Sequence, residues 1–161
     1  MTTKYSWILS PLAAVLVLGA CATTPAPKSI ADTAAANPQL TTLNKLLNEA
    51  GLADTLRGTG PYTVFAPTDE AFKAVPPATL EALAKDKSRL KTVLSYHVVP
   101  GTLLSSDVKN GPVKTVQGAD VALYKSGTFL TVEEAVVTTA DVRATNGVIQ
   151  VVDKVLLPPA K

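Results

Sequence analysis

Residues 60–76, GPYTVFAPTDEAFKAVP, constrain the fold of this chain more than any other segment. Tyr62 to Ala66 is short, is rich in β-branched and aromatic residues and is bounded by prolines, which predicts a strand fixed at both ends. A helix should begin directly after it, because the Thr68 hydroxyl can accept hydrogen bonds from first-turn amides and Asp69 places negative charge beside them. The segment therefore predicts a strand, a polar turn and a helix in immediate succession.

Apolar residues at helical spacing dominate the first half of the chain. They predict a helix from Pro38 that ends at Gly51, a short helical turn over 52–56, and a helix that starts at 76–77 and restarts at 86–88. Residues 29–36 are the candidate for a further short helix. The apolar faces of these helices are interpreted as core, with partner binding as the alternative.

The second half changes to short β-rich runs separated by turn residues. The predicted strands are Val113–Val116, Val121–Tyr124, Thr128–Val132, Ala135–Arg143 and Val148–Val155. Asn146 and Gly147 form the strongest hairpin signal, because both residues accept the positive φ of a type I′ turn. A helical first half packed on a strand-rich second half predicts an α+β domain over 38–158.

Three segments resemble conserved blocks of the fasciclin-like domain family. They are TVFAPTDEAF at 63–72, LSYHVVPG at 94–101, which contains Tyr96 and His97, and NGVIQVVDKVLLP at 146–158. The blocks occur in family order, so the resemblance implies a single fasciclin-like domain. Gln150 stands where family members commonly carry histidine, which removes support for a metal or proton role at that position.

Composition and motifs argue against several classes of function. The chain has 161 residues, 47% hydrophobic and 17% charged, with a net charge of +2, which suits one globular domain. Its basic residues are scattered and its aromatic residues few, so a nucleic-acid groove is disfavoured. No catalytic, phosphate-binding or dinucleotide motif is present, and one histidine with one cysteine cannot build a familiar zinc site. We expect no enzyme activity, no cofactor and no metal.

The first 20 residues are typical of a secretory leader. Lys4 precedes an apolar run from Trp7 to Leu18 that is too short and interrupted for a membrane span. The sequence Leu-Gly-Ala-Cys that ends at Cys21 resembles a bacterial lipobox, which implies cleavage before Cys21 and its acylation. An ordinary signal peptide and an uncleaved anchor remain the alternatives.

Acylation of Cys21 would hold the domain at a membrane surface. Residues 21–37 are then the lipidated terminus, a proline-containing tether and the candidate short helix, and 159–161 form a tail. In a diderm bacterium the resemblance favours the outer membrane.

His97 and Asp69 are the sharpest candidate pair. They could form an acid–base dyad, but a buried histidine bonded to the turn at Thr68 and Asp69 is the preferred interpretation. Asp141 and Val142 stand at the place where adhesive animal members of the resembled family carry Asp-Ile, and the acid of that pair has been implicated in receptor contact. For Asp141, a structural role in the strand pair is the preferred interpretation.

The resemblance and the absence of catalytic motifs predict a non-enzymatic envelope module for adhesion or for association with proteins, matrix or polysaccharide. The alternative is a binder of a small apolar ligand, such as a lipid or pigment, in a groove between helices and sheet. A hydrolase ranks third because it lacks a nucleophile. The residues considered for structural or interaction roles are Thr68, Asp69, Tyr96, His97, Asp141, Asn146 and Gly147, with Cys21 as the lipidation site.

Overall fold

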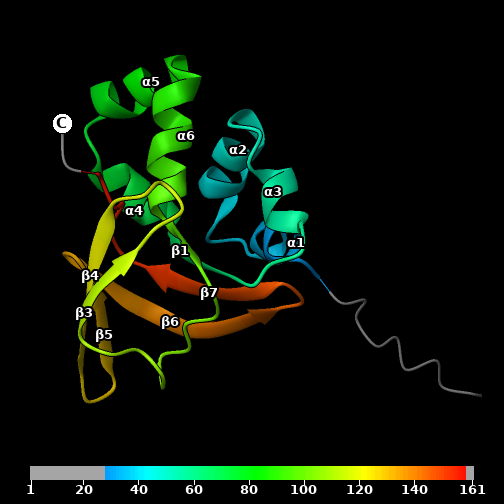
Figure 1. Ribbon diagram of the computed structural model, residues 1–161. Helices are drawn as coiled ribbons and strands as arrows, with labels where there is room; N and C mark the ends of the chain where they lie inside the picture. The colour runs from blue at the N-terminus through cyan, green and yellow to red at the C-terminus, as the bar shows by residue number, and fades with distance from the viewer. Residues whose placement is uncertain (1–27, 159–161) are drawn as a thin grey trace, which may run out of the picture.

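The computed structural model describes residues 28–158, and within this range helices dominate the first half and strands the second half (Figure 1). The helices are α1 (Ile30–Ala36), α2 (Thr41–Glu49), α3 (Ala53–Arg57), α4 (Asp69–Ala74), α5 (Pro77–Lys85) and α6 (Lys87–Tyr96). The strands are β1 (Tyr62–Pro67), β2 (Val98–Pro100), β3 (Gly111–Lys114), β4 (Asp120–Ser126), β5 (Phe129–Val132), β6 (Ala135–Ala144) and β7 (Gly147–Val152). This is the predicted α+β architecture, with the early strand β1 in its predicted place.

The seven strands form one sheet in the order β2-β1-β7-β6-β5-β4-β3. β1 pairs in parallel with β7, whereas its pairing with β2 and the pairings along the other side of β7 are antiparallel. The sheet curves so that its two edge strands, β2 and β3, approach each other. A hydrogen bond shows this approach: the Val116 amide, just after β3, donates to the Val98 carbonyl of β2 at 2.8 Å. The sheet is therefore nearly closed.

Two apolar cores lie on opposite sides of the β1–β7 pair, because successive side chains of a strand point to opposite faces. Val64 and Ala66 of β1 and Ile149 and Val151 of β7 face a core filled by helices α1, α2, α3, α4 and α6. Phe65 and Val152 face the second core, inside the curved sheet. These alternating contacts make β1 and β7 the central layer of the domain.

Helix α1 belongs to the packed domain. Its Ile30, Ala31 and Ala34 are buried in the core shared by the helices, and the Ser29 hydroxyl caps its first turn by accepting from the Asp32 amide. The candidate helix at 29–36 is thus present, and it packs against α2, α3 and the β6–β7 hairpin.

Strand β6 is irregular where it carries Asp141. The register against β7 shifts between Val137 and Thr139 and again between Thr139 and Val142. Asp141 adopts a φ of 56°, an uncommon backbone conformation for a residue other than glycine. The irregularity aims the Asp141 carboxylate at the loop that follows β2 rather than along the sheet.

None of the helices in the described part of the chain has the length and hydrophobicity that crossing a membrane would require.

Candidate functional site

His97 is a buried residue that joins α6 to the C-terminal segment. It is 1% exposed and forms the C-cap of α6. Its Nδ1 lies 2.8 Å from the Val93 carbonyl, and its Nε2 accepts a hydrogen bond from the Leu156 amide at 2.9 Å. Since a carbonyl only accepts and an amide only donates, Nδ1 must carry the proton and Nε2 must be bare.

This arrangement leaves His97 no free nitrogen for acid–base chemistry. Burial lowers the pKa of His97 to about 4, although the hydrogen bond to Val93 opposes part of that effect. The ring is therefore neutral near pH 7, and protonation at Nε2 would remove the acceptor that Leu156 uses. A structural role fits both observations.

The predicted hydrogen bond between His97 and the turn at Thr68 and Asp69 is wrong. The turn at 68–69 bonds elsewhere: the Thr68 hydroxyl caps α4 by accepting from Ala71, as predicted, while Asp69 accepts from the Thr42 amide at 2.8 Å and from the Thr41 hydroxyl. Burial alone would raise the pKa of Asp69, but these hydrogen bonds lower it below the usual value. Asp69 thus caps the start of α2 and makes no dyad with His97.

Asp141 lies in a polar network with Ser105 and Gln150. One carboxylate oxygen accepts from the Ser105 amide at 2.8 Å and from the Gln150 side chain at 2.9 Å, and the other accepts from the Ser105 hydroxyl at 2.6 Å. Gln150 is fully buried; its amide nitrogen also donates to the Leu103 carbonyl, and its oxygen accepts from the Asp141 amide. The network fastens the loop after β2 to strands β6 and β7.

The charge of Asp141 is stabilised by this network. Burial by itself would raise the pKa of Asp141, but the hydrogen bonds from Ser105 and Gln150 and the positive charge of Arg143 together lower it. The glutamine at position 150 has a clear use here, since it both donates to a carboxylate and accepts from an amide. Neither Ser105 nor this use of Gln150 was predicted from the sequence, because the residues meet only in three dimensions.

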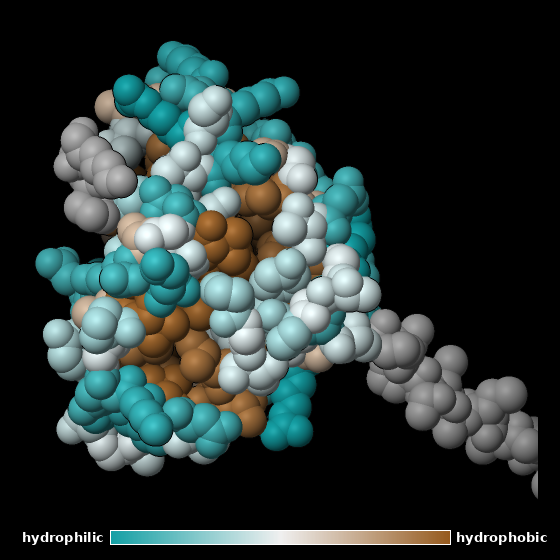
Figure 2. Space-filling view, in the orientation of Figure 1, coloured by the Kyte–Doolittle hydropathy of each residue, from teal (hydrophilic) through white to brown (hydrophobic). Residues whose placement is uncertain are grey.

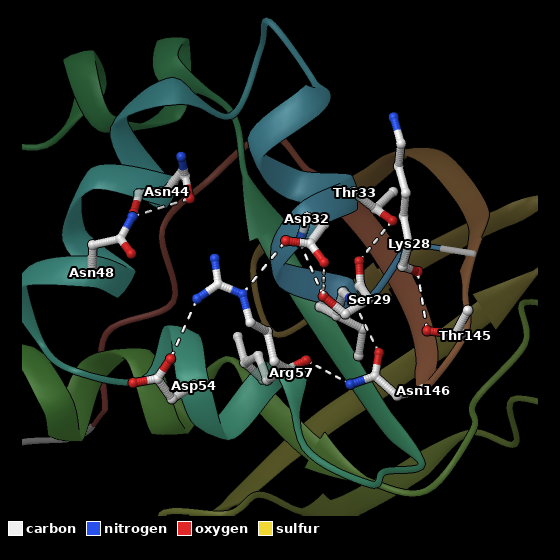
Figure 3. A network of polar contacts seen from close by, with 12 residues as sticks. Lys28, Ser29, Asp32, Thr33, Asn44, Asn48, Asp54, Arg57, Thr145 and Asn146 are labelled. Atoms are coloured by element: carbon white, nitrogen blue, oxygen red, sulfur yellow. Dashed lines mark hydrogen bonds and ion pairs between the residues drawn. The ribbon is translucent and has the colours of Figure 1, made fainter. Parts of the chain in front are cut away.

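Asn146 ties the β6–β7 hairpin to the helices (Figure 3). Its side-chain oxygen accepts from the Ile30 amide at 2.8 Å, and its side-chain nitrogen donates to the Leu56 and Gly58 carbonyls. Its backbone carbonyl accepts from the Tyr62 amide at 3.0 Å. A single residue therefore links the start of α1, the end of α3 and the start of β1.

The predicted turn geometry at 146–147 is wrong. Ala144 pairs with Gly147, so the two turn residues are Thr145 and Asn146, and neither has a positive φ. Gly147 is the first residue of β7 and has a φ of 155°; a Cβ there would lie 1.8 Å from the Tyr62 carbonyl oxygen. The glycine is required by the close passage of β1, and the asparagine by its three side-chain partners.

Tyr96 lies at the opposite end of the sheet from this hairpin. Its ring is 2% exposed among the residues of the second core, and its hydroxyl donates to the Asp120 carbonyl at 3.2 Å. Burial raises the pKa of Tyr96, and the negative charge of Glu133 adds to the effect. Its contacts are those of a packed residue with a satisfied hydroxyl.

An apolar groove runs between α2 and the α5–α6 pair, and Figure 2 shows apolar surface where these helices face one another. It has a volume of about 280 Å³, and its walls include Leu46, Leu80, Leu83 and Val93. His97 lies at its base, with both nitrogens bonded elsewhere. The groove therefore offers a ligand mainly apolar contacts, and its charged side chains, such as Lys45 and Glu49, lie at the rim.

The described residues hold no obvious metal centre. Between 28 and 158 no group of three or more His, Cys, Asp or Glu residues is close enough to bind an ion, and each buried side-chain nitrogen or oxygen there has a hydrogen-bond partner. Cys21, the predicted lipidation site, lies outside the described residues.

Comparisons with known proteins point to one family. The model of the Fasciclin domain matches residues 38–158. Protein sll1483 of Synechocystis sp. is 40% identical over 140 residues, which covers 86% of this chain and 78% of that protein. The cell surface glycolipoprotein MPB83 of Mycobacterium bovis is 38% identical over 82% of this chain, which spans 61% of the length of MPB83.

A solved structure agrees on the fold. The chain matches a FAS1 domain pair from the insect cell adhesion molecule Fasciclin I with a TM-score of 0.67 at 18% identity, covering 81% of this chain and 51% of that one. The fasciclin family is generally non-catalytic. On its sequence blocks, its nearly closed sheet and these matches, the chain belongs to the fasciclin domain family.

Proposed function

We propose that this protein is a lipid-anchored, non-enzymatic module of the cell envelope that works by adhesion or by association with proteins, matrix or polysaccharide. The observation that carries the proposal is the similarity to a cell surface glycolipoprotein over 82% of the chain, together with the lipobox-like sequence that ends at Cys21. Anchoring through Cys21 and export to the outer membrane in a diderm bacterium are parts of the proposal.

The polar chemistry of the domain is consistent with a module that acts through its exterior. His97 and Asp69, the candidates for acid–base chemistry, and Asp141, the candidate for receptor contact, each bond to backbone or side-chain groups of neighbouring elements. Their arrangement contributes rigidity, and a rigid domain presents a preorganised surface to a partner.

Anchoring is tested on the chain expressed in its bacterial envelope. Mass spectrometry of the detergent-extracted protein should show a chain that begins at Cys21 and carries acyl groups. The matched variant Cys21→Ser should lose the acyl mass and leave the membrane fraction. A wild-type chain without acyl mass would contradict the anchor.

Adhesion is tested with beads that carry the acylated chain. Beads should capture envelope material from cells, and prior treatment of the cells with protease or with glycosidase shows whether the partner is protein or polysaccharide. Equal capture by beads that carry an unrelated lipoprotein would contradict specific adhesion.

A second candidate function is binding of a small apolar ligand, and the apolar groove of about 280 Å³ between α2 and α5–α6 favours it. Native mass spectrometry should then show an additional mass that apolar solvent extracts. Ala84→Trp, at an exposed position on the groove wall, should fill the groove and remove that mass. A wild-type protein with no additional mass, isolated from its own envelope, would count against this function.

A further inference from the structure

A cleft of about 710 Å³ lies at the end of the domain where the tether enters. It is formed by the residues between α3 and β1, by Thr102 and Leu104 after β2, and by the β6–β7 turn. Its charged lining residues are Arg57 and Arg143, and no acidic residue of the described chain lines it. Threonine hydroxyls at 59, 102 and 145 add hydrogen-bonding capacity.

The two arginines differ in the ion pairs that they already make within the domain. Arg57 pairs with Asp32 at 3.4 Å and Asp54 at 3.3 Å, and all three side chains are substantially exposed (Figure 3). Such exposed pairs are weak, so they can be exchanged for a better anion. Arg143 is exposed and makes no ion pair or side-chain hydrogen bond with residues 28–158. Asp141 is near enough to interact electrostatically with Arg143, but the carboxylate oxygens of Asp141 accept their hydrogen bonds from Ser105 and Gln150.

The tether joins the domain beside this cleft. The Lys28 carbonyl accepts hydrogen bonds from the Thr145 amide at 2.9 Å and from the Thr145 hydroxyl at 3.2 Å, and Thr145 lines the cleft. Six residues lie between Cys21 and Lys28, so the seven steps from one Cα atom to the next can span at most about 25 Å. An acylated Cys21 therefore keeps the cleft end of the domain close to the membrane surface.

We infer that this cleft binds the phosphate of an anionic phospholipid and docks the domain on the membrane to which its tether is attached. The inference rests on the proposed acylation of Cys21. Planar guanidinium groups match phosphate geometry with paired hydrogen bonds, and Arg143 has its donors available. Docking would bring the β6–β7 turn to the bilayer and leave the β4–β5 hairpin, with exposed Tyr124 and Phe129, on the side away from it (Figure 1).

The test uses the acylated full chain reconstituted into two kinds of vesicle, phosphatidylcholine alone and phosphatidylcholine mixed with phosphatidylglycerol. A fluorophore is attached to a cysteine introduced at Thr55, which is exposed on α3 and does not line the cleft, or at Ser126, at the far hairpin. Cys21 is blocked by its acyl groups and does not react. Lipids with a quencher on the headgroup report contact. We expect stronger quenching at 55 than at 126, and we expect this difference only in vesicles that contain phosphatidylglycerol.

Arg143→Gln should lower the ratio of docked to undocked protein about fivefold, the effect of one basic residue at an anionic surface. Arg89→Gln on α6, away from the cleft, is the matched control and should change nothing. Quenching at 55 that is equal in both vesicles, or that is unchanged by Arg143→Gln, would overturn the docking while leaving the anchor intact. A chain that fails to float with either vesicle would contradict the anchor and, with it, the docking.

Discussion

The two ends of the domain use different polar residues to hold a connecting segment in place: the β6–β7 turn at one end and the segment after β7 at the other. At the hairpin end, Asn146 bonds to α1 and α3 through its side chain while Gly147 lets β1 pass. At the tail end, Asp153 bonds to Val136 directly after β7, and farther along the chain His97 accepts from the Leu156 amide. The hairpin attachment uses an uncharged amide with several partners, and the tail attachment uses a ring that can gain a proton.

The difference predicts two kinds of sensitivity. The hairpin attachment should respond strongly to substitution and little to pH, because neither an amide nor a glycine titrates. The tail attachment should respond to both, because protonation of His97 removes its acceptor atom. Substitutions at each end of the domain, measured at more than one pH, test this contrast.

Gly147→Ala should be the most damaging substitution at the hairpin end. A Cβ 1.8 Å from the Tyr62 carbonyl forces the backbone of β1 and β7 apart, so we expect a loss of about 5 kcal/mol of unfolding free energy or failure to fold. Urea unfolding measures it. Gly127→Ala is the control, since that glycine has a φ of 60° but open space around it, and it should cost only about 1 kcal/mol. Equal losses would refute the role of the close strand passage.

Asn146→Ala should cost about 4 kcal/mol, because it leaves the Ile30 amide and the Leu56 and Gly58 carbonyls without their partner, at about 1–3 kcal/mol each when buried. Chemical unfolding at pH 7 and at pH 5 should show the same loss. Asn48→Ala, on the exposed face of α2, is the matched control and should change stability by less than about 0.5 kcal/mol.

Acid should weaken the tail end through His97. Its pKa is about 4 in the folded chain and 6.5 when unperturbed, so the unfolded state binds more protons between these values. The stability that neutral His97 provides is complete above pH 6.5 and declines as the pH falls toward 4, by roughly 3 kcal/mol in all. Unfolding followed across this range measures the slope.

His97→Leu should be less stable than the wild type at pH 7 and should lose most of the slope between pH 6.5 and 4. Because His97 is the only histidine in the chain, a variant that keeps the full slope would assign the pH dependence to other groups.

Asp141→Asn should have the smallest effect of the four, about 1–2 kcal/mol, because the amide keeps the shape of the carboxylate but weakens its bonds to Ser105. The lowered pKa of Asp141 means that the wild type loses this contribution only as the pH falls below the ordinary aspartate range. Asp107→Asn, at an exposed position in the same loop, is the control. An equal effect of both variants would argue against a specific network.

The local parts of the fold could be predicted from the sequence. Thr68 caps α4 where its hydroxyl and the following acids predict a cap, and β1 has the predicted start. The ends of several strands differ by a few residues; β3, for example, is Gly111–Lys114 rather than Val113–Val116. These differences arise because pairing partners, rather than composition, decide where a strand stops.

The parts that depend on distant partners could not be predicted. The histidine was correctly expected to be buried and satisfied, but its partner Leu156 is brought to it only by the path of the chain after β7. Asn146 was identified for a turn conformation that it does not adopt, and its side-chain partners on α1 and α3 are far away in sequence. Single-sequence patterns carry no information on such long-range hydrogen bonds.

The parallel pairing of β1 with β7 has a consequence for how the chain acquires its structure. Among the strands of residues 28–158, β7 is the last to be synthesised, yet it occupies an interior place in the sheet beside β1, the first. Until it is made, one edge of β1 is unpaired and the helices lack the apolar contacts that Ile149 and Val151 provide. The central layer of the domain can therefore form only after nearly the whole polypeptide has been synthesised, so this fold is acquired after synthesis rather than strand by strand during it.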